Sequence, residues 1–329
     1  MPSVFFLGAT GYIGGCVLVA LRRRHPDWPV TALVRKVQHV GCIRALGVAV
    51  VPGSFSDESL IIEQTGQADY VVNIADSKSV SLTVAILVGM KLRHVDGRGK
   101  GTLFHTSGLA TLLDGRREGV FDPGGRVFDD ADQDAIRSVM PSMPHSDVEI
   151  PILKASEAGY IDSYILCPGA ILGPSKGPVN VPNPFLKLVV PLFLSLKHGA
   201  CVGQGTNEVP LVYVDDVVDY FLRVIELAYS VWDAGSGPYQ RFFVVSASVY
   251  SWRNISRAVA GAMHRRGLLE DDSLVSVPPH GEVSRQLQHF SENALIVAEK
   301  GKALGWGPLR VDTREWFDEI LDDFLTSSH

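Results

Sequence analysis

Three glycines near the start of the chain have the spacing of a phosphate-binding turn. They are Gly8, Gly11 and Gly14, within the segment GATGYIGG. The apolar residues 4–7 precede them and a helical apolar pattern follows, which predicts a strand, a tight turn and a helix. Gly8 would allow the turn, Gly11 would let the backbone approach a pyrophosphate, and Gly14 would let the helix pack on the strand. A purely structural turn is the alternative, but this context favours dinucleotide binding.

The second predicted strand, at 29–35, ends on basic residues. Arg35 and Lys36 stand where an acidic side chain would hydrogen-bond the 2'-hydroxyl of the adenosine ribose in NAD. A guanidinium instead matches the planar geometry of a 2'-phosphate. We therefore predict that the cofactor is NADP(H). A solvated arginine at a strand end is the alternative.

Other apolar segments predict the remaining elements that must position these residues. We expect strands within 47–57, 68–76, 100–108, 162–174 and 241–248, a helix at 81–94, and a strand followed by a helix at 210–228. Ser246 or Ser248 would cap the helix after 241–248. Alternating strands and helices indicate an α/β fold with a doubly wound parallel sheet, the Rossmann fold.

Ligands of such sheets bind beyond the carboxyl ends of the strands, where we also expect Ser107. The residues that we assign to the cofactor are Gly8, Thr10, Gly11, Tyr12, Ile13, Gly14, Arg35, Lys36, Ala75, Asp76, Pro168, Gly169 and Ile171.

The composition excludes several classes of protein. The chain has 329 residues, 46% of them hydrophobic and 20% charged, which indicates a globular protein with a buried core. A net charge of −6 leaves no basic excess for nucleic acid. The four cysteines have no paired or metal-ligand spacing, and the ten histidines show no HxH or HExxH pattern, so we predict no metal site.

The apolar runs at 81–90 and 185–196 are shorter than the roughly 18 residues of a membrane span. The first predicted strand begins too early to leave room for a signal peptide. We therefore expect a cytoplasmic protein that does not bind membranes.

The order of these segments resembles the short-chain dehydrogenase/reductase superfamily. The segments that carry the resemblance are GATGYIGG, the strand ending in arginine, NIAD at 73–76, HTSG at 105–108, PGAILGP at 168–174 and VYVDDVVDYF at 212–221. The chain is most similar to the extended or atypical (NmrA-like) branch, and more narrowly to fungal NAD(P)-binding epimerase-like or reductase-like proteins. The resemblance covers residues 3–320.

The resemblance implies that the chain is divided into a dinucleotide-binding domain and a substrate-binding lobe. Residues 1–170 and 211–247 would form the dinucleotide-binding domain, and residues 171–210 and 248–329 a smaller, mostly helical substrate-binding lobe. This lobe would cover the nicotinamide. Candidate pocket residues for an apolar substrate, with helix core as the alternative, are Phe185, Leu188, Leu192 and Phe193. Lys176 would reach an anionic group or remain solvated.

Members of this superfamily transfer hydride at a carbinol carbon with a serine, a tyrosine and a lysine four residues after the tyrosine. Ser107 stands at the serine position, although it could instead cap the backbone at a strand end. None of the nine tyrosines is followed by a lysine at this spacing. The corresponding positions before the strand at 162–174 hold His145 and Glu149.

A spacing of four residues would place Glu149 one helical turn from His145. The carboxylate would then raise the pKa of the imidazole and make it a general acid. A surface or capping histidine is the alternative. Pro151 bears on this geometry, because a regular helix that began there would leave His145 in a loop without Glu149. Lys154 would then be the nearest cation.

These residues and the resemblance together predict an NADP(H)-dependent oxidoreductase, specifically a reductase of the extended or atypical short-chain dehydrogenase type. Its substrate would be a small apolar carbonyl or enone of secondary metabolism. The alternatives are a non-redox isomerase or cyclase on the same scaffold, and a catalytically silent regulator that senses NADP(H). The sequence does not identify the substrate or the oligomeric state, for which a homodimer is one alternative.

Overall fold

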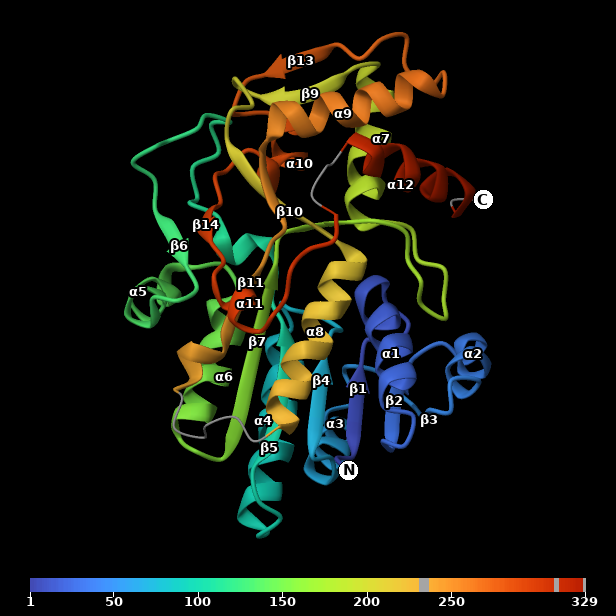
Figure 1. The fold of residues 1–329 in the computed structure, drawn as a ribbon, viewed down its shortest axis with the longest axis vertical. Helices are drawn as coiled ribbons and strands as arrows, with labels where there is room; N and C mark the ends of the chain where they lie inside the picture. Colours follow the sequence, from blue (N-terminus) through green and yellow to red (C-terminus); the bar gives the residue numbers. More distant parts are fainter. Residues whose placement is uncertain (231–236, 311–313, 328–329) are drawn as a thin grey trace.

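A seven-stranded parallel sheet forms the centre of the molecule (Figure 1). The computed structural model describes residues 1–230, 237–310 and 314–327. The strand order is β11-β7-β5-β4-β1-β2-β3. The strands are β1 (Val4–Leu7), β2 (Val30–Val34), β3 (Ala49–Pro52), β4 (Tyr70–Asn73), β5 (Gly101–Thr106), β7 (Ile161–Pro168) and β11 (Phe242–Val245). This order confirms the doubly wound sheet, whose direction of winding reverses between β1 and β4.

Helices cover both faces of this sheet because its strands are apolar on both sides. Val4 and Phe6 of β1 point into one core, and Phe5 and Leu7 into the other. The first core is closed by α1 (Tyr12–Arg24) and α8 (Val214–Tyr229). The second is closed by α3 (Glu58–Gln67), α4 (Val80–Val95) and α6 (Ser146–Glu157).

A smaller lobe lies beyond the carboxyl ends of the strands, at the top of Figure 1. Its strands are β8 (Ala170–Leu172), β10 (Glu208–Tyr213) and β12 (Ser248–Ser251) in one sheet, and β9 (Gly199–Val202) with β13 (Leu274–Val277) in another. Its helices are α7 (Pro184–Leu196), α9 (Trp252–Arg265), α10 (Glu282–Gln286) and α12 (Arg314–Ser327). Trp252 and Phe317 lie at the centre of its core.

The remaining elements are shorter. They are α2 (Val40–Arg44), β6 (Val127–Asp129), which pairs with β14 (Leu295–Val297), α5 (Gln133–Val139), α11 (Lys300–Ala303) and the 3₁₀ helices η1 (Val37–His39), η2 (Leu109–Leu112), η3 (Met140–Ser142), η4 (Pro238–Arg241) and η5 (Gln288–Phe290). None of the helices in the described ranges has the length and apolar character that crossing a membrane requires.

The predicted strand at 162–174 is two strands in two different sheets. The chain leaves the central sheet after β7 and enters the lobe as β8, which pairs with β10. Gly169 lies at the break, where a Cβ atom would be only 2.5 Å from the carbonyl oxygen of Pro210. The single apolar run concealed this break, because both strands are buried.

The predicted cap of the helix after β11 was also wrong. Neither Ser246 nor Ser248 caps α9, because β12 intervenes between β11 and that helix. The cap is Ser251, whose Oγ accepts a hydrogen bond of 3.3 Å from the backbone N–H of Asn254.

Candidate functional site

The glycine-rich turn joins β1 to α1 at the carboxyl edge of the sheet. Gly8 has a φ of +96°, and a Cβ atom there would lie 2.3 Å from the carbonyl oxygen of Ile74. A Cβ atom at Gly14 would lie 2.2 Å from the carbonyl oxygen of Gly8, so both positions require glycine. Gly11 is the N-cap of α1, and the first turn of this helix holds no acidic residue. The free backbone N–H groups in the first turn of α1 fit a pyrophosphate. Contact between Gly11 and a pyrophosphate stays a prediction.

Arg35 and Lys36 directly follow β2 and are both exposed. The guanidinium carbon of Arg35 lies 4.7 Å from the centre of the Phe55 ring. Neither basic side chain forms an ion pair with another residue of the described ranges. Their charges are therefore available to a 2'-phosphate, which is the contact that we predict.

The other residues that we assigned to the cofactor lie along the same edge. Thr10 belongs to the glycine-rich turn, and Ala75 and Asp76 lie in the loop after β4. Pro168 ends β7, and Gly169 separates it from β8. Thr10, Ala75 and Asp76 flank the point between β1 and β4 where the sheet reverses its winding, which is where ligands bind in such folds. Their contact with a cofactor stays a prediction.

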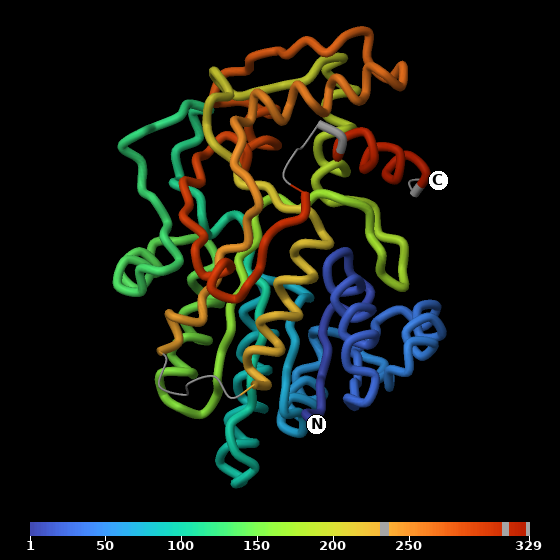
Figure 2. The backbone as a smooth tube through the Cα atoms, in the orientation of Figure 1, coloured from blue at the N-terminus to red at the C-terminus, as the bar shows by residue number. Residues whose placement is uncertain are grey.

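Hydrogen bonds of Tyr12 connect the start of α1 to the loop at 173–183. Its hydroxyl donates to the carbonyl oxygen of Gly173 (2.7 Å) and accepts from Nδ2 of Asn183 (2.8 Å). Burial raises the pKa of this phenol well above its ordinary value. The loop descends from the lobe along the start of α1 (Figure 2), and a Cβ atom at Gly15 would lie 3.1 Å from Cα of Gly177.

Ser107 and Glu149 meet in a buried polar cluster. Oγ of Ser107 hydrogen-bonds to the carboxyl group of Glu149 and lies 3.0 Å from Oγ1 of Thr111. Thr111 also donates to the Glu149 carboxyl group, at 3.1 Å. Burial raises the pKa of Glu149 to about 7, against the opposing effect of these two hydrogen bonds. No sequence motif pointed to Thr111, because only the fold brings η2 beside α6.

His145 lies immediately before α6 and has a left-handed backbone with φ of 71°. Its Nδ1 is 3.3 Å from Oγ1 of Thr111, and its buried Nε2 has no partner in the described ranges. The helix begins ahead of Pro151, at Ser146, so His145 is a cap residue. The predicted pairing of its imidazole with the Glu149 carboxylate is wrong, because the left-handed backbone directs the ring toward Thr111 instead.

The predicted rise in the pKa of His145 is also wrong. Burial lowers its pKa from the ordinary value of 6.5, and the charges of Lys78 and His289 lower it further. Asp76 opposes these effects. A lowered pKa leaves the imidazole neutral near pH 7, so His145 is suited to accept a proton.

A cavity of about 360 Å³ lies beside His145, between the sheet edge and the lobe. The residues that line it are Tyr12, Ile13, Ser77, Lys78, Gly108, Leu109, Ala110, His145, Ala170, Ile171, Pro184, Phe185, Leu188, His289 and Phe290. A neighbouring cavity of about 300 Å³ shares four of them: Lys78, Ala110, His145 and His289. Neither Lys78 nor His289 belongs to a motif that the sequence reveals.

The structure divides the predicted pocket residues. Phe185 and Leu188 line the cavity, but Leu192 and Phe193 are 5% and 0% exposed and belong to the lobe core. Successive turns of α7 therefore face different surroundings. Ser107 is only 4% exposed and does not line the cavity, because it faces Glu149.

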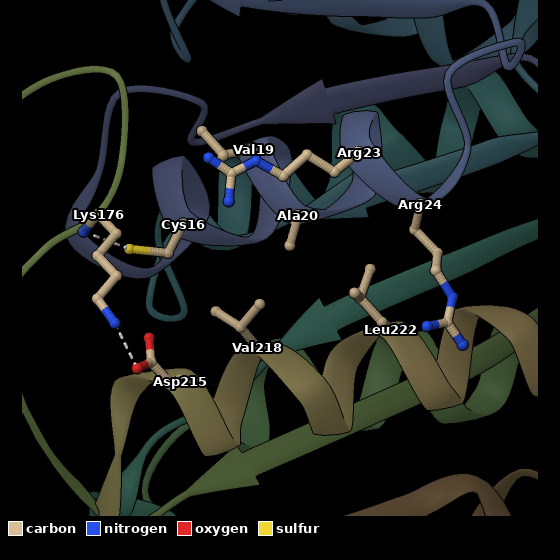
Figure 3. A pocket seen from close by; sticks show the side chains of 9 residues that line it. All are labelled: Cys16, Val19, Ala20, Arg23, Arg24, Lys176, Asp215, Val218 and Leu222. Atoms are coloured by element: carbon tan, nitrogen blue, oxygen red, sulfur yellow. Dashed lines mark hydrogen bonds and ion pairs between the residues drawn. The ribbon is translucent and has the colours of Figure 1, made fainter.

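Lys176 lines a different cavity, of about 530 Å³, between α1 and α8 (Figure 3). Its ammonium group pairs with Asp215 at 2.5 Å, and its backbone N–H donates to the sulfur of Cys16 at 3.1 Å. It therefore does not reach the cavity beside His145. Lys154 is exposed on α6 and lines neither cavity.

Within 1–230, 237–310 and 314–327, no group of three His, Cys, Asp or Glu side chains is placed to hold a metal ion.

Comparison of the sequence with known proteins finds relatives, one of which is an oxidase by name. The chain is 26% identical over 293 residues to a protein named oxidase ucsJ from Acremonium sp, and the match covers 84% of this chain and 82% of that protein. No protein-family model matches the chain.

Comparison with solved structures finds the same architecture in several enzymes. One is dTDP-glucose 4,6-dehydratase from Bacillus anthracis in complex with NAD, with a TM-score of 0.64, 13% identity, and coverage of 99% of this chain and 97% of that one. Vestitone reductase from alfalfa has a TM-score of 0.62, 15% identity and coverage of 100% and 99%. UDP-glucose 4-epimerase from Thermotoga maritima, with UDP-glucose, has a TM-score of 0.62, 17% identity and coverage of 99% and 100%. At these identities the likeness establishes the fold.

Proposed function

Because the chain has the fold of the extended short-chain dehydrogenases/reductases, we propose that it is an oxidoreductase that uses NADP(H). The observation that carries the proposal is the position of His145. The resemblance assigns it the place of the superfamily tyrosine. It lines the cavity at the sheet edge, and one of its ring nitrogens has no partner among the described residues. The substrate is an apolar alcohol or the corresponding carbonyl compound.

The turn of Gly8, Gly11 and Gly14 would hold the pyrophosphate, and Arg35 with Lys36 would hold the 2'-phosphate. When bound, the nicotinamide supplies a hydride acceptor or donor. Nε2 of His145 takes the hydroxyl proton during oxidation and returns it during reduction. Because its pKa is lowered, the imidazole is ready as a base, which favours oxidation of the alcohol. The name of the Acremonium relative agrees with this direction.

Thr111, Ser107 and Glu149 act as positioning residues in this proposal. The hydroxyl group of Thr111 contacts Nδ1 of His145. The same hydroxyl group hydrogen-bonds to Ser107 and to the Glu149 carboxyl group. This cluster fixes the imidazole ring so that Nε2 is left for the substrate. Ser107 therefore helps to position His145. The resemblance implies a different role, in which the serine contacts the substrate directly.

Turnover with a panel of apolar alcohols and ketones tests the proposal. We expect the wild type to form NADPH from an alcohol of this panel, and His145→Phe to lose at least about 100-fold in kcat, the size of a general acid–base contribution. Lys154→Met, a change on the exposed side of α6, should retain full activity. Product formation without any change in NADPH would show an isomerase instead. NADPH binding without turnover of any compound would favour the regulator.

A further inference from the structure

Three basic side chains from distant parts of the chain surround the cavity beside His145. Lys78 comes from the loop between β4 and α4, His145 from the start of α6, and His289 from η5. All three line both the larger cavity and its neighbour. The fold therefore concentrates basic groups at one place, although the chain as a whole has a net charge of −6.

The ammonium group of Lys78 forms no ion pair with a carboxylate of the described ranges. Asp76, the nearest acidic residue in the sequence, accepts a hydrogen bond of 2.9 Å from the backbone N–H of Lys78. The Lys78 charge instead acts on the cavity, where it lowers the pKa of both His145 and His289.

His289 also presents a polar atom without a partner. Its Nδ1 is buried and forms no hydrogen bond within the described ranges. The nearby Glu292 does not supply one, because its carboxylate binds Nε of Arg117 (2.9 Å) and the backbone N–H of Gly115 (3.0 Å). A buried imidazole nitrogen without a partner is costly unless a ligand contacts it.

The remaining wall of the larger cavity is mostly apolar. Leu109, Ile171, Phe185, Leu188 and Phe290 contribute hydrophobic side chains, and no described Asp or Glu lines this cavity. A ligand that matches both features has an apolar body and a negatively charged end. The apolar wall would bury the body, the ammonium group of Lys78 would offset the charge, and the His289 imidazole would donate a hydrogen bond to it.

We propose that the substrate carries an anionic oxygen group, bound by Lys78 and His289, on an apolar body that places its reacting carbon beside His145. A carboxylate and the enolate of an acidic enol share this chemistry. This proposal rests on the proposed function, because it assigns His145 to the reacting centre. It defines the substrate as an apolar acid, whereas the sequence alone predicted only an apolar carbonyl compound.

Binding of a matched pair of probes tests this anion site. Cinnamate and cinnamamide have the same apolar body and differ in charge. In calorimetric titrations of the NADP⁺-loaded protein, we expect cinnamate to bind about tenfold more tightly, a preference equivalent to 1.4 kcal/mol. Lys78→Met should remove this preference and Lys78→Arg should keep most of it. Lys154→Met is the matched control and should leave it unchanged.

The two proposals fail in different ways. Equal affinity for the two probes in the wild type, or an unchanged preference in Lys78→Met, would overturn the anion site. Undetectable binding of cinnamate would also overturn it. A protein that does not take up NADP⁺ in the preceding titration would contradict the proposed function instead. The preference should weaken as salt is added, because the interaction is electrostatic.

Discussion

The polar cluster behind the cavity gives its two ionisable residues opposite properties. Burial raises the pKa of Glu149 to about 7 and lowers that of His145. Burial favours the neutral form of each group. Neither residue is among the causes of the pKa shift of the other. Thr111 lies between them and hydrogen-bonds to both. The histidine therefore reaches the cavity neutral and oriented, which is the state that a general base requires.

The pH dependence of alcohol oxidation should report the lowered pKa of His145. A neutral imidazole accepts the proton, so kcat/KM should rise with pH and level off, with a midpoint below the ordinary value of 6.5. The measurement is NADPH formation across the acidic range. His145→Gln should remove this limb together with most of the activity. A midpoint above 6.5 would contradict the lowered pKa.

Replacement of Glu149 by Gln should stabilise the protein at alkaline pH. The raised pKa means that the wild type loses stability as the pH rises from 4.5, the ordinary value, through about 7. Glutamine carries no charge, so urea unfolding should show Glu149→Gln more stable by roughly 3 kcal/mol above pH 7. This advantage should shrink as the pH approaches 4.5. Glu157→Gln, an exposed change on the same helix, should show no such trend.

Arg35 should determine the choice between the two nicotinamide cofactors. Loss of its charge-assisted hydrogen bonds in Arg35→Ala should weaken NADPH binding by roughly tenfold to 100-fold. NADH has no 2'-phosphate, so its affinity should stay nearly constant. Fluorescence titration measures both, and Arg44→Ala provides an exposed control on α2. An equal loss for both cofactors would show that Arg35 does not contact the 2'-phosphate.

Among the secondary-structure elements, α1 and α7 are joined by one buried asparagine. Asn183 caps α7 by accepting hydrogen bonds from the backbone N–H groups of Phe185 (3.0 Å) and Leu186 (3.1 Å). Its Nδ2 donates to Tyr12 at the start of α1. The asparagine therefore links the helix that would bind the pyrophosphate to the helix that forms the cavity wall.

Asn183→Ala should destabilise the protein by roughly 2–3 kcal/mol, because it removes a helix cap and leaves the buried Tyr12 hydroxyl with one partner fewer. Urea unfolding measures the free energy. Asn254→Ala is the matched control, since this asparagine is exposed on α9. It should change the free energy of unfolding by less than about 0.5 kcal/mol. Equal effects of the two substitutions would show that Asn183 does not link the helices.

In the molecule as a whole, the cavity lies between the central sheet and the lobe. Gly108 follows β5, and Leu188 belongs to α7 in the lobe. His289 comes from η5, in the last fifth of the chain. A cavity built from such distant segments depends on how the two parts pack together. The break at Gly169 is essential to this arrangement, because it carries the chain from the sheet into the lobe.

Sequence alone determined the features that depend on neighbouring residues. The glycine spacing of the first turn and the apolar strands with their alternating helices predicted the sheet. They could do so because backbone sterics and side-chain periodicity act over a few residues. The same reasoning located Arg35 at the end of β2. The break at Gly169 could not be predicted in this way, because two consecutive buried strands have the apolar pattern of a single strand.

Only the tertiary structure decided the surroundings of His145. Its distance to Glu149 in the sequence suggested a pair, but the left-handed backbone directs its ring to Thr111. Lys78 and His289 carry no motif and meet only because the fold brings their loops together. The shift in a pKa depends on burial and on charges nearby in space, which the order of residues along the chain does not specify.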